Sequence, residues 1–330
     1  MRKLYLLGLA LLSSSMLLAQ SNTNQSKFRQ LRQQLPTPND YRTASGAPGH
    51  EYWQQQADYD IKVSLDEEIH RITGQETITY TNNSPDELYY LWVQLDQNMR
   101  APESDTYKTA TNSLRERMSP KKVKRIMGYP GYDGGHKIQS VKNRRGNDMP
   151  YEIVKTMMRV ELDEPLKPGQ STKMDIEWYY NINDRDLMGG RGGYECFEDG
   201  NCLYTITQWF PRMAVYDDIN GWQHKQFLGR GEFALPFGDY KVEITVPADH
   251  VVASTGVLQN PKDVLSNKEQ DRFEKSKDAD RPVMIVTPEE AKKKEKGKKA
   301  NGTKTWVYEA EDVRDFAFGS SRKFIWDAMG

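Results

Sequence analysis

Apolar and polar residues alternate along most of the chain after residue 50. Residues 59–65 carry an apolar side chain at every second position, which is the pattern of a strand with one buried face. Turn residues such as Asn-Asn-Ser-Pro at 82–85 separate runs of this kind. The pattern predicts strands at residues 59–65, 72–81, 88–95, 138–141, 151–154, 158–162, 173–180, 203–208, 238–247, 251–255 and 304–309.

Helical periodicity is scarce by comparison. We expect one helical turn at residues 28–35 and a short helix at 111–118. Residues 291–299 hold six lysines in nine positions, and we interpret them as a solvated helical turn and loop after Pro288. An isolated cluster on a neutral chain is weak evidence for a membrane or polyanion patch. Many short strands and few amphipathic helices predict an all-β, largely antiparallel fold.

Composition narrows the classes of partner. The chain has 330 residues, and its 46 basic and 47 acidic side chains give a net charge of −1, which argues against nucleic acid as a partner. Aromatic residues make up 11%, too many for a disordered chain. After residue 20 no apolar run approaches the ~20 residues of a membrane span. We therefore expect a core-forming chain with no transmembrane span.

The first residues have the layout of a secretory signal peptide. Arg2 and Lys3 precede an apolar run at 4–12, and small residues lead to Ala19. We expect a signal peptide at 1–19, with the protein exported to the periplasm or the extracellular space. An anchor helix is the alternative, but the apolar core is short for one. Residues 20–48 are rich in Gln, Asn, Ser and Pro and predict a flexible leader, which leaves 49–330 as the main domain.

Export changes how the two cysteines are interpreted. Cys196 and Cys202 flank Asp-Gly-Asn, which is turn chemistry that can bring two thiols together. In an oxidising compartment a disulfide across this small loop is the leading interpretation, and two free buried thiols are the alternative. A zinc site with His224 as third ligand is disfavoured, because paired metal cysteines usually lie two to four residues apart.

No motif for catalysis or metal binding occurs. The five histidines form neither HExxH nor a close pair, and no G-x-S-x-G elbow is present. The glycines at 189–193 lack the GK[ST] ending of a phosphate loop, so we interpret them as a flexible loop that can approach another surface closely. Asp217 and Asp218 are better explained by a polar turn than by a glycosidase carboxylate pair. The chain thus predicts no catalytic and no metal-ligating residue of its own.

The densest stretch of aromatic residues lies at 194–222. Aromatic surfaces with a few polar groups are typical of peptide and sugar sites, although the same composition also builds ordinary cores. The chemistry alone leaves both interpretations open. The stretch combines rings and polar groups at Gln208, Trp209, Phe210, Arg212, Tyr216, Asp217, Asp218 and Trp222.

Several motifs occur together and in a fixed order. The run at 52–95 contains YDIKVSLD and ITGQETITYTNN, and it is followed by GGRGGYE at 189–195 and TQWFPR at 207–212. GDYKVEITVP at 238–247 and VRDFAF at 313–318 complete the series. In this order the motifs resemble the M1 family of zinc aminopeptidases, most closely the secreted branch of Bacteroidetes-type bacteria. The resemblance covers about residues 50–330.

The resemblance implies a large, saddle-shaped, mostly antiparallel β domain that packs against a thermolysin-like catalytic domain. In the family that second domain carries G-x-M-E-N and HExxH, holds the zinc and hydrolyses the N-terminal peptide bond. Neither motif occurs in this sequence. We therefore expect the N-terminal portion of such an enzyme, without the catalytic domain and its zinc, contributing to the peptide cleft but inactive alone.

One position carries over from the family. The Gln of its Thr-Gln motif lies near the substrate's first residue and matches Gln208. In the family a second polar residue, two places later, helps bind the free amine of the substrate. In this sequence that position is Phe210, which departs from the family pattern. We predict peptide contacts from Gln208, Trp209, Phe210 and Arg212. The alternative is a stand-alone exported β-sandwich that binds peptide or carbohydrate through Trp209, Tyr216 and Trp222.

Overall fold

The computed structural model describes residues 38–109, 116–120, 122–123, 131–231 and 233–330. The expected signal peptide, the helical turn at 28–35 and most of the expected helix at 111–118 lie outside these ranges. The chain divides into two compact units, Met1–Tyr52 and Trp53–Gly330.

The described part of the first unit is a hydrogen-bonded loop. The side-chain oxygen of Asn39 accepts from the backbone N–H of Tyr41 at 2.9 Å and of Arg42 at 2.8 Å, which is an Asx turn. Arg42 and Pro48 then form an isolated β-bridge. The end of the expected leader therefore has a defined turn.

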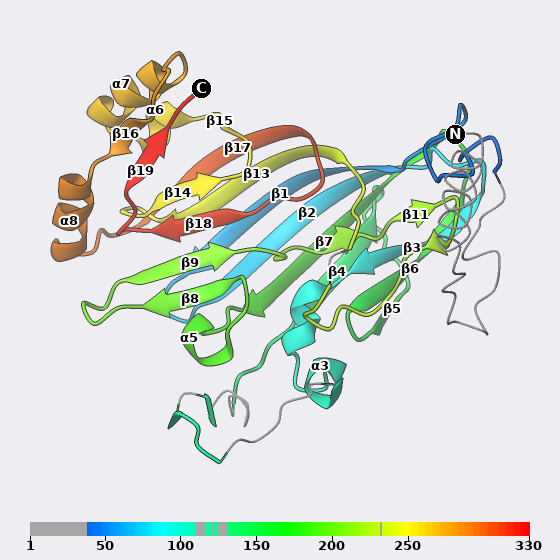
Figure 1. The fold of residues 1–330 in the computed structure, drawn as a ribbon, viewed down its shortest axis with the longest axis horizontal. Helices are drawn as coiled ribbons and strands as arrows, with labels where there is room; N and C mark the ends of the chain where they lie inside the picture. The colour runs from blue at the N-terminus through cyan, green and yellow to red at the C-terminus, as the bar shows by residue number, and fades with distance from the viewer. Residues whose placement is uncertain (1–37, 110–115, 121, 124–130, 232) are drawn as a thin grey trace, which may run out of the picture. The chain divides into compact units, whose positions relative to one another are not determined.

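The second unit is built on a seven-stranded sheet (Figure 1). Neighbouring strands in it are antiparallel except β1 and β13, which are parallel. Its order is β15 (Val257–Leu258), β17 (Thr303–Val313), β13 (Gly238–Pro247), β1 (Gln56–Asp66), β2 (Arg71–Thr81), β7 (Ser171–Asn181) and β4 (Lys137–Asn143).

Strict alternation gives this sheet one buried face. Along β1 the side chains of Tyr59, Ile61 and Val63 are buried, while those of Asp60 and Lys62 are exposed. The same period of two runs along β13. Because successive side chains of a strand point to opposite faces, the apolar set of each strand lies on the same side of the sheet.

Two smaller sheets cover the buried face. One has the order β10 (Arg212–Met213), β3 (Leu88–Gln94), β6 (Met157–Leu166) and β5 (Tyr151–Val154). The other has the order β14 (Val251–Ser254), β18 (Phe318–Ser321), β9 (Cys202–Ile206) and β8 (Gly193–Cys196). Aromatic rings fill the space between the layers: Trp178 of β7 lies 5.8 Å from Trp209, and Tyr59 of β1 lies 5.4 Å from Phe210.

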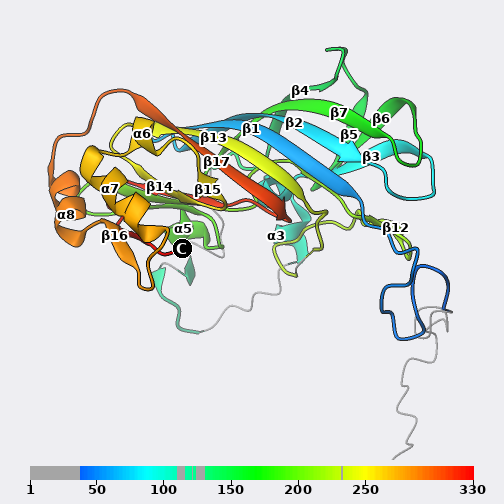
Figure 2. The same cartoon turned by 90° about the horizontal axis from the view of Figure 1, so that it is seen from above.

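Two ribbons and several short helices complete the unit. The ribbons pair β11 (Tyr216–Asp217) with β12 (Gly221–Trp222) and β16 (Val283–Val286) with β19 (Trp326–Ala328). Figure 2 shows α6, α7 and α8 gathered at one end of the long strands. The helices are η1 (Asp96–Arg100), α3 (Asp105–Thr109), α5 (Arg185–Met188), α6 (Pro261–Val264), α7 (Asn267–Ser276) and α8 (Pro288–Lys296).

The structure confirms the predicted all-β, mostly antiparallel class. The lysine-rich segment forms α8, which begins with a capping box between Thr287 and Glu290, as the interpretation of a helical turn anticipates. Helix α7 was not predicted. Over the described ranges, none of the helices combines the length and the apolar character that crossing a membrane needs.

One carboxyl group interrupts the apolar inner face. Glu76 of β2 is 3% exposed, and neither of its oxygens has a hydrogen-bond partner among the described residues. Its strand neighbours across the sheet are Ile61 and Ile176. Burial raises the pKa of Glu76 well above its usual value, because ionisation in apolar surroundings is unfavourable.

We expect Glu76→Gln to remove a pH-dependent loss of stability. A raised pKa in the folded state means that stability is fully present below the ordinary pKa and declines as pH rises through the titration. Urea unfolding from about pH 5 to about pH 8 should show a steeper decline for the unmodified protein than for Glu76→Gln. Glu177→Gln, on the exposed face of β7, is the matched control and should leave the slope unchanged. Parallel profiles for Glu76→Gln and the unmodified protein would contradict the assignment.

Candidate functional site

The segment 207–213 leaves the end of β9 and enters β10. Its first turn is fixed at Gln208, whose φ of +52° is unusual for a residue with a side chain. The Gln97 side-chain N–H2 donates to the carbonyl of Thr207 at 3.2 Å and to that of Gln208 at 2.9 Å. These bonds hold a backbone conformation that costs on the order of 1–3 kcal/mol on its own.

The glycine loop between α5 and β8 lies against this turn. A Cβ at Gly192 would come within 2.8 Å of the Thr207 hydroxyl, and one at Gly190 within 2.6 Å of Arg100. The side-chain N–H2 of Asn183 fixes the loop by donating to the carbonyl of Gly192 at 3.1 Å. Gly190 and Gly193 have φ of +106° and +142°, which side chains rarely adopt, and a Cβ at Gly193 would lie 2.6 Å from the backbone carbonyl of Asn183. The tight turn and close approach that the sequence suggested for these glycines therefore both occur.

His136 holds the next peptide group. Its Nε2 lies 3.1 Å from the carbonyl oxygen of Trp209, which can only accept, so Nε2 carries the proton. Nδ1 is buried and has no partner among the described residues. Burial lowers the pKa of His136 to about 4, and the bond to Trp209 opposes that shift. The ring is therefore neutral at neutral pH and acts as a fixed donor.

Trp209 and Phe210 are fully buried in the layer between the sheets. The indole N–H of Trp209 donates to the carbonyl of Phe316 at 2.8 Å, and its ring packs edge-to-face on Phe318 at 5.4 Å. Phe210 packs against Trp209 at 4.9 Å. For these two residues the structure supports a packing role in place of the predicted peptide contact.

Arg212 is also unavailable to a ligand. Its side chain is 6% exposed and pairs with two carboxylates, Asp96 of η1 and Asp315, the latter at 2.8 Å. These partners lie more than a hundred positions away in the sequence. Arg212 therefore ties β10 to η1 and to the segment after β17, which revises its predicted role in peptide binding.

Gln208 alone of the four presents a polar group outward. Its side chain is half-buried, and within the described ranges its amide makes no hydrogen bond. An amide offers two N–H donors and one carbonyl acceptor, so it can bind the amine or the backbone of a peptide. Gln97, His136 and the glycine loop fix the backbone from which this side chain extends.

The aromatic surface expected for sugar or peptide stacking is mostly covered. Trp222 is 9% exposed and packs edge-to-face on Tyr216 at 5.2 Å. The Tyr216 hydroxyl donates to Asp86 at 2.8 Å. Asp217 accepts from the backbone N–H of Ile219 and Asn220, so it caps the turn between β11 and β12. The polar-turn interpretation of the acidic pair is therefore correct for Asp217.

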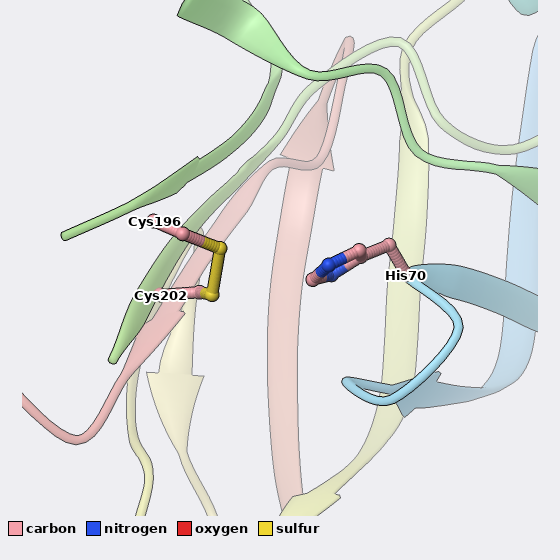
Figure 3. Close-up of side chains that lie close together, drawn as sticks. All are labelled: His70, Cys196 and Cys202. Carbon is pink, nitrogen blue, oxygen red and sulfur yellow. A yellow bond between two sulfur atoms is a disulfide. The ribbon is translucent and has the colours of Figure 1, made fainter. Parts of the chain in front are cut away.

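Cys196 and Cys202 lie opposite each other at the turn between β8 and β9, and their sulfur atoms are bonded. His70, from the turn between β1 and β2, points toward this disulfide (Figure 3). His224, the third ligand considered from the sequence, instead stacks on Trp92 at 5.0 Å. His70 could not be found from the sequence, because it is 126 positions before Cys196 and no spacing rule connects them.

In the described part of the chain, His70, Cys196 and Cys202 form the one group with three potential metal ligands close together. Catalytic zinc needs three free ligands and an open position. Two of these three ligand atoms are bonded to each other, so the residues present do not fit a catalytic zinc site.

Comparison with family models and with curated proteins gave no match. Among solved structures, the chain is similar to the M1 zinc metallopeptidase of Deinococcus radiodurans, with 12% identity and a TM-score of 0.41. A mutant of that enzyme bound to a Tyr-Ser-Ala substrate gives 11% identity and a TM-score of 0.41. The alignments cover 83% and 81% of this chain, and 43% and 42% of those chains. The chain thus spans less than half the length of these structures.

We expect Arg212→Ala to destabilise the protein by about 3 to 5 kcal/mol, because it leaves the buried Asp96 carboxylate without its partner. The free energy of unfolding in urea measures this. Arg145→Ala, at an exposed position, should change it by less than about 0.5 kcal/mol. A loss of the same size in both variants would show that the ion pairs of Arg212 contribute little.

We expect stability to fall in acid because of His136. Its pKa drops from 6.5 to about 4 on folding, so stability is fully present above pH 6.5 and is lost as pH falls toward 4. At about 1.4 kcal/mol per pKa unit, the loss is about 3 kcal/mol. His136→Gln should flatten this part of the profile, whereas the exposed His50→Gln should not. An unchanged acid slope in His136→Gln would refute the burial argument.

Proposed function

We propose that this chain is the N-terminal substrate-cleft domain of a secreted M1-type zinc metallopeptidase. In this role it contacts the first residue of a peptide and performs no hydrolysis by itself. The proposal rests on the ordered motifs at 52–95, 189–195, 207–212, 238–247 and 313–318, and on the placement of Gln208.

The position of Gln208 is the observation that carries the proposal. Of the four predicted contact residues it is the one whose side chain is partly exposed, while the other three are buried. Two hydrogen bonds from the Gln97 side chain stabilise the backbone at its positive φ. Strained residues that are held by their surroundings cluster at functional sites.

The chemistry of hydrolysis would come from a second domain. An M1-type enzyme polarises the scissile carbonyl and activates water with zinc held by three protein ligands. This chain would position the substrate. The Gln208 amide would bind the substrate's amino end, so that the peptide bond reaches the metal of the partner domain. Phe210 is buried, so the second polar contact of the family is missing on this side.

A stand-alone lectin-like or peptide-binding β-sandwich is the weaker candidate. It would need aromatic faces open to solvent, since stacking on sugars or peptides requires contact with the ring. Trp209 is fully buried and Trp222 nearly so. The burial of both indoles favours the amide-based site over an aromatic one.

Titration of the ¹⁵N-labelled, oxidised chain with a tripeptide that has a free amino terminus tests the proposal. The side-chain amide signals of Gln208 should shift, and N-acetylation of the peptide should weaken binding. Gln208→Ala should lower the affinity by about 2- to 10-fold, which corresponds to one lost hydrogen bond of about 0.5–1.5 kcal/mol. Gln139→Ala, at an exposed position of β4, is the matched control.

The same oxidised chain should not hydrolyse an aminoacyl chromogenic substrate, with or without added zinc. Hydrolysis that a chelator abolishes would overturn the assignment of catalysis to another domain. Peptide binding that survives Gln208→Ala but is lost in Gln139→Ala would place the site elsewhere.

A further inference from the structure

The turn of the β1–β2 hairpin brings an imidazole to the disulfide of the β8–β9 hairpin. One nitrogen of His70 and the two sulfur atoms of Cys196 and Cys202 all lie within 4.8 Å of one another. Figure 3 shows the His70 side chain extending from its own turn toward the sulfur pair. Two segments far apart in the sequence therefore meet at three groups that are ligands for thiophilic metals.

The position of the His70 ring is well defined. The ring stacks on Tyr194 with centroids 3.8 Å apart and planes inclined by 12°. The backbone of His70 has φ +51°, and its carbonyl accepts from the N–H of Ile182 at 2.8 Å. Asp66 caps the turn by accepting from the N–H of Glu68 at 2.9 Å. Such anchoring keeps the imidazole beside the sulfur atoms instead of in solvent.

The hydrogen-bond partner of His70 is a buried tyrosine, Tyr204. Nδ1 lies 2.8 Å from the Tyr204 hydroxyl, and that hydroxyl donates to the carbonyl of Glu67 at 3.4 Å. In the tautomer in which Nδ1 donates to Tyr204, Nε2 carries the lone pair. Metal-binding histidines have this arrangement: one ring nitrogen donates to a neighbour and the other binds the ion. Tyr204 is fully buried, so the donor pair is held rigidly.

We propose that reduction of Cys196–Cys202 creates a Cys₂His site for Zn²⁺ or a similar thiophilic divalent cation. An external dithiol reduces the disulfide: the S–S bond breaks, both sulfurs gain a hydrogen, and the dithiol becomes a disulfide. The cation then replaces the two thiol protons and binds Nε2 of His70, with a water as fourth ligand. Binding therefore releases two protons, and the oxidised chain does not bind the ion.

The geometry allows this exchange. Tetrahedral zinc with Zn–S near 2.3 Å and Zn–N near 2.0 Å needs ligand atoms about 3.5 to 3.8 Å apart. Once the S–S bond is open, the sulfurs separate by rotation about their side-chain bonds while the Cα atoms remain 4.1 Å apart. The side chain of Cys196 is exposed, so the reductant and the ion can both reach it. The bound ion would join the β1–β2 turn to the β8–β9 ribbon, a connection that the disulfide does not make.

This site is independent of the proposed peptide contact at Gln208 and of the catalytic zinc of an M1-type enzyme. Its test uses the full chain, reduced with a phosphine and freed of reductant without oxygen, and Co²⁺ as the probe. We expect one equivalent of Co²⁺ to bind, with the near-ultraviolet absorption of cobalt thiolate. Zn²⁺ should displace the Co²⁺ and raise the midpoint of thermal unfolding of the reduced chain.

Matched variants identify the ligands. His70→Ala should weaken Co²⁺ binding by more than about 10-fold. Tyr204→Phe, which removes only the hydroxyl that contacts Nδ1 of His70, should weaken it by about 10- to 100-fold. His224→Ala is the control and should bind like the unmodified chain. The oxidised chain should show no thiolate absorption with Co²⁺.

Two results would overturn the site. One is a reduced, folded chain that takes up no Co²⁺ or Zn²⁺. The other is uptake that is the same in His70→Ala and in the unmodified chain, which would mean that the two thiolates bind the ion without the imidazole. Circular dichroism of each reduced variant, measured first, establishes that the chain is still folded.

Discussion

The backbone of residues 207–213 is held by side chains from other parts of the fold, and the layers meet along it. Gln97 binds its first two carbonyls, His136 binds the third, and the Tyr59 hydroxyl accepts from the N–H of Met213 at 2.9 Å. Arg212 adds two ion pairs. Hydrogen bonds and ion pairs from remote side chains therefore restrict the segment to one arrangement. The outward amide of Gln208 depends on that arrangement.

The β8–β9 hairpin connects this segment to the disulfide. Cys202 begins β9, and Gln208 follows two residues after its end. The glycine loop that precedes β8 lies against Thr207, and the far end of the hairpin lies against His70. A single short ribbon thus positions both the proposed peptide contact and the proposed metal site. Each site also needs a residue more than a hundred positions earlier in the chain. Gln97 holds the backbone at Gln208, and His70 lies beside the disulfide.

Most of the strands could be predicted from the sequence because a half-buried strand alternates with a period of two. Residues 72–81 and 238–247 are close or identical to β2 and β13. Helix α7 was missed although Ser266 and Glu269 form the capping box that marks a helix start; its polar composition hid the helical period. The parallel pairing of β1 with β13 could not be predicted, since it joins strands about 180 residues apart.

The candidate site was less predictable than the fold. The motif at 207–212 identified the segment that carries the candidate site. Composition does not show which of its side chains are buried and which are exposed. Arg212 looked like a ligand contact because its partners, Asp96 and Asp315, are remote in sequence. Trp209 and Phe210 looked equally suited to a surface or a core, and only the three-dimensional packing places them in the core. The positive φ of Gln208 has no sequence signal, since glycine is the residue expected there.

A crystal structure of the chain with a bound tripeptide would show whether Gln208 contacts the amino end of a peptide. We expect the peptide's amino-terminal residue within about 3 Å of the Gln208 side-chain amide, with the 207–213 backbone unchanged. A peptide bound instead along the Tyr216–Trp222 ribbon, or a Gln208 turn that flips to negative φ on binding, would contradict it.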